Sequence, residues 1–349
     1  MNKLLKKVGC FALAGLSLFA LTACGTVQGE EQEDLNISIW DGETITPAEE
    51  LALKVVTDGQ DVNGKKYNTI KIGEAADFVA AMRDINNYQN FTIELERDID
   101  MADMPWDSTI INGDSSALDC TITIDGDNNT IYGLTNMLIS KAHLGGTSIV
   151  IKDLIIDQAN IVVDAEDANE DVAVGAFVGK LGGGIKNVTI DNCHLINSRV
   201  EGGHWTGGIY GIASGYSQAN SPVFMDILIN DCSVKGNLIT GKGSVGAIAG
   251  HATAAVWTKV VVEDSSVINN EISSTGDSAI KAGIVMGTVG SAGDPYTAVN
   301  GITKTGGSFV NNITYSQNDV YSHGTKIDRI YGRLAGGKLY IDETLVVEN

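Results

Sequence analysis

The sequence has little proline, few aromatic residues and few cysteines for a chain of its length. Its 349 residues include 4 prolines and 6% aromatic residues, against 41 glycines. Together with many Ile, Val, Thr and Asn residues, this composition favours short strands and tight turns over helices. After residue 24 the cysteines are Cys120, Cys193 and Cys232. Their odd number and wide spacing exclude a disulfide framework, and without a Cys-x-x-Cys pair the usual signature of zinc is missing.

Basic residues are also scarce. The chain has 23 Lys and Arg residues against 44 Asp and Glu residues, for a formal net charge of −21 at pH 7. Nucleic acid is excluded as a partner, because phosphate binding needs clustered Lys and Arg. The same charge argues against a protein that lies flat on an anionic membrane. It favours solubility in an ion-rich exterior.

The N-terminus has the three parts of an export signal, and no second long apolar run follows it. Positive lysines precede the apolar stretch Val8–Leu21, which is shorter than the roughly 20 residues that a spanning helix needs. The stretch ends in Leu21-Thr22-Ala23-Cys24, which resembles the bacterial lipobox. Met1–Ala23 is therefore interpreted as a lipoprotein signal peptide rather than as a transmembrane anchor or an ordinary secretory leader.

The lipobox resemblance implies that lipid is attached to the Cys24 thiol and that cleavage makes Cys24 the first residue. Two or three acyl chains anchor a protein stably, where one chain is marginal. Gly25–Asp34 is small and acidic without apolar periodicity, which predicts a flexible tether. We expect a protein held to a bacterial membrane and exposed outside the cytoplasm, at the cell surface. Which membrane receives the lipid stays open.

Two kinds of internal repeat follow. One pattern, in which an apolar run is followed by polar residues such as Asp or Asn and then by a further apolar residue, occurs in four segments. They are Ile151–Ile161, Ile185–Leu195, Met225–Val234 and Thr258–Val267. Glycine pairs spaced four apart occur at Gly175 and Gly179, Gly207 and Gly211, Gly246 and Gly250, Gly283 and Gly287, and Gly332 and Gly336. Units of this kind cannot bury their own apolar faces, whereas stacked units can, which predicts a β-solenoid.

Equivalent positions of the repeats predict columns of stacked residues. The glycines suit turns with positive φ or close contact between neighbouring coils. Ser198, Asn237, Asn270 and Asn312 fall at corresponding places, which predicts an amide ladder at a turn. Cys193 and Cys232 also fall in register, and we expect stacked buried thiols rather than a disulfide.

The glycine pieces, best seen in Gly208-Ile-Tyr-Gly211, resemble the repeat of GLUG-motif bacterial surface proteins. The resemblance extends over Asn68–Asn349 and implies an all-β fold, a right-handed parallel β-helix of the pectate-lyase-like type. It also implies a short N-terminal helix, and the spacing of Phe78, Met82 and Ile85 independently predicts a helix within 73–89 that would cover the first coil. The expected domains are a signal peptide at 1–23, a tether and N-terminal extension at 24–67, a cap at 68–97 and the β-helix at 98–349.

The repeats suggest one candidate site. When the four repeat segments are aligned with one another, Asp157, Asp191, Asn230 and Glu263 share one column. Gln158, Asn192, Asp231 and Asp264 share the next. Neighbouring coils lie about 4.8 Å apart, so Asp157 with Asp191 and Asp231 with Asp264 would form close carboxylate pairs. Buried pairs of this kind could act in acid–base catalysis or hold calcium. Asp and Asn are also the ordinary residues of β-turns, and this alternative stays open.

Other polar groups carry weaker signals. The acidic loop 164–171 and the Asp125–Asn129 segment have calcium-like oxygen groups, but a solvated loop and a turn explain them as well. The histidines, which are His143, His194, His204, His251 and His323, occupy unrelated repeat positions. Trp205, with Tyr210 and Tyr216, could stack on sugars or could simply be partly buried.

These features predict a lipid-anchored surface protein that works as a binding, adhesion or structural module. A carbohydrate or another surface component is the expected partner, since solenoids offer long faces with variable loops. The alternative is a polysaccharide lyase or glycoside hydrolase that uses the stacked carboxylates. The fold by itself does not choose between them.

Overall fold

The computed structural model describes residues 36–60, 64, 66–88, 90–111, 120–143, 146–163, 172–182, 184–214, 217–218, 221–222, 225–253, 258–276, 281–290 and 307–346. All of them belong to the unit Asn36–Asn349. The expected signal peptide and tether, Cys24, Tyr216 and the acidic loop lie outside the described residues. Within the described residues no helix is long and apolar enough to cross a membrane.

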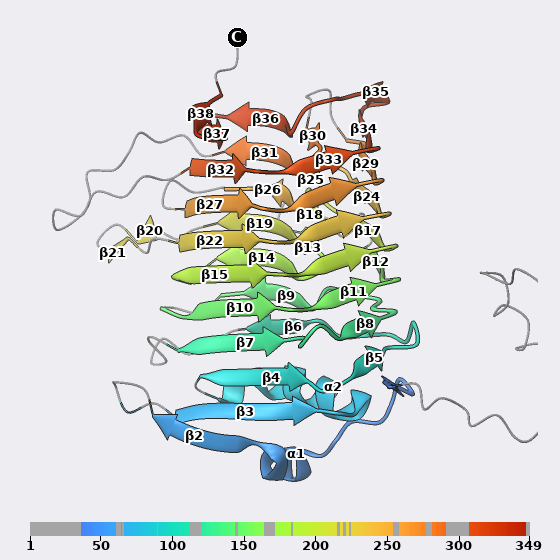
Figure 1. Ribbon diagram of the computed structural model, residues 1–349, viewed down its shortest axis with the longest axis vertical. Coiled ribbons are helices and arrows are strands. Elements are labelled where there is room, and N and C mark those ends of the chain that lie inside the picture. The colour runs from blue at the N-terminus through green and yellow to red at the C-terminus, as the bar shows by residue number, and fades with distance from the viewer. Residues whose placement is uncertain are drawn as a thin grey trace, which may run out of the picture. The chain divides into compact units, whose positions relative to one another are not determined.

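The chain winds through successive coils whose strands pair in parallel with the same strands of the next coil (Figure 1). A full coil runs through β15 (Asn187–Asp191), β16 (His194–Ile196), β17 (Arg199–Gly202), β18 (Trp205–Gly207) and β19 (Tyr210–Ser214). Each of these five strands belongs to a different sheet, which we name first to fifth in this order. The all-β parallel solenoid expected from the repeats is confirmed.

The first and second sheets form the longest stacks. Besides β15, the first sheet contains β2 (Val56–Gln60), β3 (Lys66–Ile72), β4 (Phe91–Leu95), β7 (Thr121–Asp125), β10 (Ser148–Lys152), β22 (Met225–Asn230), β27 (Thr258–Glu263), β32 (Gly307–Asn311), β37 (Leu339–Ile341) and β38 (Thr344–Leu345). Besides β16, the second sheet contains β1 (Ile37–Ile39), β5 (Asp98–Asp100), β8 (Thr130–Tyr132), β11 (Ile155–Asp157), β23 (Ser233–Lys235), β28 (Ser266–Ile268) and β33 (Thr314–Ser316).

The other three sheets close each coil. Besides β17, the third sheet contains β12 (Asn160–Val162), β24 (Leu238–Gly241), β29 (Glu271–Ser274), β34 (Asp319–Ser322) and β35 (Thr325–Lys326). Besides β18, the fourth contains β13 (Ala173–Gly175), β25 (Ser244–Gly246) and β30 (Ala282–Gly283). Besides β19, the fifth contains β6 (Thr109–Ile111), β9 (Ile139–Ala142), β14 (Val178–Gly182), β26 (Ala249–His251), β31 (Met286–Gly290) and β36 (Tyr331–Ala335). A separate hairpin pairs β20 (Ser217–Gln218) with β21 (Ser221–Pro222).

The core lies inside the coils and is built by alternation along each strand. In β7, β10 and β15 every second residue points inward, so Ile124, Ile151 and Ile190 stack in one fully buried column. β-branched residues suit such positions, and burying each of these side chains contributes about 1.5–3 kcal/mol. The residues between them point outward and are free to be polar.

A glycine interlock joins the fourth and fifth sheets. Gly175, Gly207, Gly246 and Gly283 of the fourth sheet meet, in this order, Gly211, Gly250, Gly287 and Gly332, each on the fifth-sheet strand of the next coil. A Cβ atom on Gly207 would lie 2.0 Å from the Tyr210 carbonyl oxygen and 2.8 Å from the Gly250 nitrogen. Backbone therefore packs on backbone, and the close contact between coils that the repeats predicted is confirmed for these four pairs. The glycines of the fifth repeat divide the two predicted roles, because Gly332 belongs to the interlock while Gly336 is a turn residue with φ of 76°.

An amide ladder runs along the corner between the second and third sheets. The backbone N–H of Ser198 donates to Asn237 Oδ1 at 2.8 Å, and those of Asn237 and Asn270 donate to Asn270 and Asn318 at 3.0 Å. The predicted ladder is therefore real, but its last member is Asn318. Asn312 lies at the preceding corner, where it takes a φ of 50°.

The thiols of Cys193 and Cys232 are stacked, buried and free, as expected. Each lies beside backbone carbonyl groups, with Cys193 Sγ 3.3 Å from the Asp191 oxygen and Cys232 Sγ 3.2 Å from the Asn230 oxygen. Burial raises the pKa of the Cys193 thiol well above its usual value, so the unreactive thiol form is favoured.

The N-terminal end of the stack is covered by helices. The expected helix is α2 (Ala75–Asp84), extended by η1 (Ile85–Asn87), and its apolar face is buried with Phe78 stacked on Trp106. α1 (Ala48–Lys54) is tied to it by Lys54 Nζ, which donates to both oxygens of buried Asp77 at 2.7 and 2.9 Å. The stretch assigned to the N-terminal extension also contributes β1, which pairs in parallel with β5.

Candidate functional site: polar columns and a trough on the first sheet

The outer face of the first sheet carries columns of residues that are in register on successive coils. At the C-terminal ends of the strands lies the charged column, whose members are Lys71, Glu94, Asp125, Lys152, Asp191, Asn230, Glu263 and Asn311. The turn column follows directly after it and consists of Asp153, Asn192, Asp231, Asp264 and Asn312. Four of the five predicted carboxylates, which are Asp191, Asp231, Glu263 and Asp264, lie in these two columns.

The predicted pair of Asp157 with Asp191 is wrong. Asp191 pairs in register with Lys152 of the preceding coil, whereas Asp157 lies in the second sheet opposite Ile196. The error is a slip of five residues, since Ile151 is in register with Ile190 and not with Ile185. Gln158 is displaced for the same reason and lies with Asp157 at the end of the second sheet.

Turn geometry accounts for the turn column. All five residues adopt the left-handed backbone conformation, with φ between 48° and 51°. Asn and Asp tolerate this conformation better than other residues with a side chain, because their short polar groups can bond locally. For Asp231 and Asp264 the structure therefore supports the turn interpretation that the sequence left open.

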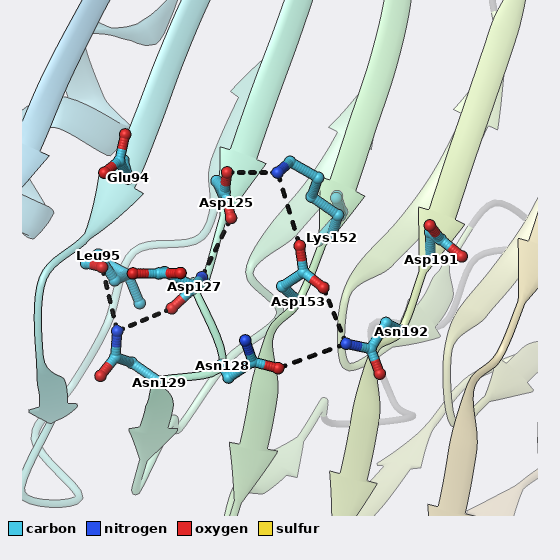
Figure 2. A network of polar contacts seen from close by, with 12 residues as sticks. Glu94, Leu95, Asp125, Asp127, Asn128, Asn129, Lys152, Asp153, Asp191 and Asn192 are labelled. Carbon is cyan, nitrogen blue, oxygen red and sulfur yellow. Dashed lines mark hydrogen bonds and ion pairs between the residues drawn. The ribbon is translucent and has the colours of Figure 1, made fainter.

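Several carboxylates of the two columns are bonded to amides or to a lysine (Figure 2), whereas Asp231 and Asp264, the second predicted pair, are neighbours in the turn column. Lys152 Nζ lies 2.5 Å from Asp125 and 3.5 Å from Asp153, and the hydrogen bond to Asp125 is the main reason why the pKa of Lys152 is raised. Asn192 donates to Asp153 at 2.8 Å, and Asn230 donates to Asp191 at 2.7 Å. In the next coils Asn312 donates to Asp264 at 2.5 Å.

These contacts bear on the possibility that the carboxylates hold calcium. Among the described residues, no group of three or more His, Cys, Asp or Glu side chains is arranged to hold a metal ion. Calcium takes six to eight oxygen ligands, whereas Asp153, Asp191 and Asp264 each accept a hydrogen bond from an asparagine amide. The acidic loop 164–171 lies outside the described residues.

A serine–histidine contact, which the sequence did not suggest, lies on the second sheet. Ser233 Oγ and His194 Nδ1 are 2.9 Å apart on neighbouring coils. Burial lowers the pKa of His194, and the nearby Asp231 charge opposes this shift. The Asp231 and Ser233 N–H groups donate to carbonyl oxygens of neighbouring coils, so neither is available to stabilise an oxyanion beside this serine.

The aromatic candidates are distributed differently from the expectation. Tyr210 is fully buried and donates its hydroxyl to the Ala252 carbonyl at 3.1 Å, so it cannot stack on a sugar. Trp205 is half-buried between His204 and His251, with ring centres at 4.9 and 6.3 Å. Burial lowers the pKa of His251 to about 4, and neither of its ring nitrogens has a hydrogen-bond partner within the described residues.

The outer face of the first sheet is also hollowed. Between β15, β22 and β27 lies a trough of about 470 Å³. Its floor is formed by Thr189, Leu228 and Val261, one wall by Asn187, Asp226 and Lys259, and Glu263 stands at one end. A second hollow of about 430 Å³ lies over the third sheet near Glu201 and Lys242. The Glu201 carboxylate there is held by Arg199, whereas the first trough is built from columns in register.

The trough continues a middle column of outward residues along the whole first sheet. From the N-terminal end this column reads Thr69, Thr92, Thr123, Val150, Thr189, Leu228, Val261, Phe309 and Tyr340. Threonine predominates up to Thr189 at the start of the trough, and from Leu228 onward the column is apolar and aromatic. Phe309 and Tyr340 stack with ring centres 4.9 Å apart, and Lys259 lies over Phe309 at 5.3 Å. Sequence reasoning missed the trough, although reading every second residue of the aligned strands would have indicated it.

Comparisons with known proteins add information on the fold. No protein-family model matches the chain, and no curated protein matches it. Among solved structures the chain is similar to a protein from Bacteroides ovatus described as a "putative immunoglobulin A1 protease", at 17% sequence identity and a TM-score of 0.52. The similarity covers 81% of this chain and 80% of that one. At this identity it supports the repetitive β architecture, and it carries no activity over to this chain.

Proposed function

We propose that this protein is a lipid-anchored, surface-displayed binding module that presents the outer face of its first sheet to a carbohydrate or another surface component. The trough over β15, β22 and β27 is the observation that carries the proposal. Its volume of about 470 Å³ falls in the range of ligand sites, which is roughly 300–1,000 Å³. The anchor rests on the export signal and on Cys24.

The proposal includes the finer identity of the fold. We infer a right-handed parallel β-helix of the pectate-lyase-like type with GLUG-like repeats. The support for the hand is general, because parallel strands joined within one sheet cross over right-handedly in nearly all proteins. The support for the GLUG-like repeat is the Gly208-Ile-Tyr-Gly211 piece, whose first glycine comes directly after the interlocked Gly207 and whose last belongs to the interlock.

A glycan-degrading enzyme is the second candidate, and one observation favours it. Asp191 and Glu263 lie in the charged column two coils apart, so their Cα atoms are about 9.6 Å from each other. Inverting glycosidases hold their two carboxyl groups roughly 6.5–9.5 Å apart, which side chains on Cα atoms at this spacing could reach by leaning toward each other. Both carboxylates belong to the same outward column of the first sheet, however, so they do not face each other across a cleft. Asp191 also accepts a hydrogen bond from Asn230.

The anchor is tested in cells that express the full chain. We expect the wild type to incorporate labelled palmitate, to sediment with membranes and to be cut by protease added to intact cells. Cys24→Ala should lose the label and leave the membrane fraction. A label that persists in Cys24→Ala, or a protein that resists external protease until the cells are lysed, contradicts the anchoring or the display.

Binding is separated from catalysis by measuring both on one panel of glycans. A binding module retains a glycan in affinity electrophoresis and releases no reducing ends. A hydrolase releases them, and this release should stop in Asp191→Asn and Glu263→Gln. A protein that neither retains nor cleaves any glycan, and that binds no surface protein of its host or neighbours, contradicts the proposed function.

A further inference from the structure

The walls and the floor of the trough repeat from coil to coil. Asn187, Asp226 and Lys259 are in register on β15, β22 and β27, and the floor residues are in register two positions further along the same strands. Each set therefore advances by about 4.8 Å per coil. We propose that the trough binds a neutral, linear polysaccharide that lies along the stack with one sugar unit on each coil. This inference rests on the proposed binding function and names its ligand class.

The repeat length of the ligand must match the repeat of the site. An extended peptide advances about 3.3 Å per residue, so it falls out of step with coils spaced about 4.8 Å apart. A pyranose unit in an extended chain has about the length of one coil. A glycan chain can therefore make an equivalent contact on each of the three coils, which a peptide along the same line cannot.

The chemistry of the trough suits a polyol. The floor is apolar at Leu228 and Val261, which offers a surface for the carbon–hydrogen faces of sugar rings. The wall supplies an amide, a carboxylate and an ammonium group, which can accept from and donate to hydroxyl groups. Glu263 adds a second carboxylate at the end of the trough.

The charges favour a neutral chain over a uronate. Asp226 and Glu263 face the trough, and Lys259 is the one cation among the described residues that line it. A polyuronate would bring a carboxylate onto every coil, next to these acidic groups, and like charges placed together oppose binding. The formal net charge of −21 acts in the same direction over a longer range.

Affinity electrophoresis through gels that contain hydroxyethyl cellulose, galactomannan or polygalacturonate tests the proposal. Leu228→Arg places a long charged side chain on the trough floor, and Thr123→Arg makes the same outward change on β7, three coils away. We expect at least one neutral polymer to retard the wild type and Thr123→Arg, with about tenfold weaker binding by Leu228→Arg. Polygalacturonate should not retard the wild type. Calorimetry with oligomers of the bound glycan should show an affinity that rises up to the trisaccharide and then levels.

Each other outcome overturns the inference in a recognisable way. Stronger retardation by polygalacturonate than by the neutral polymers contradicts the charge argument. Equal retardation of Leu228→Arg and Thr123→Arg contradicts the assignment to the trough. A wild type that dimerises in sedimentation experiments, with the dimer lost in Leu228→Arg, assigns the trough to a second copy. If no glycan binds but a purified surface protein does, and Leu228→Arg abolishes that binding, the ligand class is wrong while the proposed function stands.

Discussion

The glycine interlock and the outer face of the first sheet are both built from residues in register, yet they leave very different room for side chains. In the interlock the backbone atom nearest to a single added Cβ would lie at 2.0–2.6 Å. On the outer face of the first sheet the middle column passes from threonine through valine and leucine to phenylalanine and tyrosine without a break in pairing. The strands of the first sheet thus stay paired although their outward side chains vary. Where the fourth and fifth sheets meet, by contrast, the glycines leave no room for a side chain.

This difference separates stability from recognition. Close packing of backbone on backbone fixes the path of each coil and tolerates almost no substitution. The outward columns contribute little to the core, so their residues can change to suit a ligand. Substitutions in the interlock should therefore cost far more stability than substitutions in the outward columns.

Gly207→Val should produce the largest loss of stability. The new side chain would overlap the Tyr210 carbonyl and the Gly250 nitrogen, and backbone cannot move away as a side-chain end can. We expect a loss of more than about 4 kcal/mol in the free energy of unfolding, measured by urea denaturation. Gly73→Ala is the matched control, because the nearest atom to its Cβ would be Glu96 Oε2 at 3.7 Å. Equal stability of the two variants would disprove the interlock.

Acidification should weaken the stack through His251. Its pKa is about 4 in the folded protein against 6.5 for a free side chain, so the unfolded chain binds the proton more readily. The stabilisation by the neutral ring is complete above pH 6.5 and is lost as the pH falls through about 4, for a total of about 3 kcal/mol. Denaturation curves between pH 4 and 7 should show this slope, and His251→Leu should reduce it. An unchanged slope in the variant would assign the effect to other groups.

Asn237→Ala should cost about 2 kcal/mol of unfolding free energy. The change leaves the buried Ser198 N–H and Leu195 carbonyl without the bonds that Asn237 supplies, and orphaned buried groups are costly. Asn318→Ala, at the end of the same ladder, should cost less because it is only partly buried. Thermal unfolding of both variants measures the difference. A larger effect at Asn318 would contradict the account of the ladder.

Lys152→Met should change stability by less than about 1 kcal/mol. The lysine bridges Asp125 and Asp153, but its side chain is 39% exposed and its ion pairs are accessible to solvent and salt. Thermal unfolding at low and high salt checks this, and the small difference should shrink at high salt. A loss as large as that of Asn237→Ala would mean that the charged column is part of the structural frame.

Much of the fold could be predicted because each coil of a solenoid repeats the same kinds of residue at equivalent positions. Ile and Val at every second position indicated strands with one buried face. The glycine pairs indicated close contacts between coils. The register was harder to predict. The segments that begin at Ile151 and Ile185 look alike, yet one begins near the end of its strand and the other precedes its strand. A slip between them moved Asp157 into the wrong column.

The trough was beyond the sequence reasoning for a different reason. It depends on which residues point outward and on which strands lie side by side, and both require the true register. The turn column shows the opposite case, because the preference of Asn and Asp for left-handed corners follows from their own chemistry. His251 could not be singled out at all, since its burial comes from coils that are distant in sequence.

Two adjacent residues of β22 test the central contrast most directly. Ile227 points into the core and is 2% exposed, whereas Leu228 points outward onto the trough floor. Thermal unfolding and affinity electrophoresis of Ile227→Arg and Leu228→Arg should be measured side by side. We predict that Ile227→Arg loses its cooperative transition, while Leu228→Arg melts within about 2 °C of the wild type and loses glycan retention. Equal destabilisation of the two variants, or full retention by a folded Leu228→Arg protein, would contradict the account.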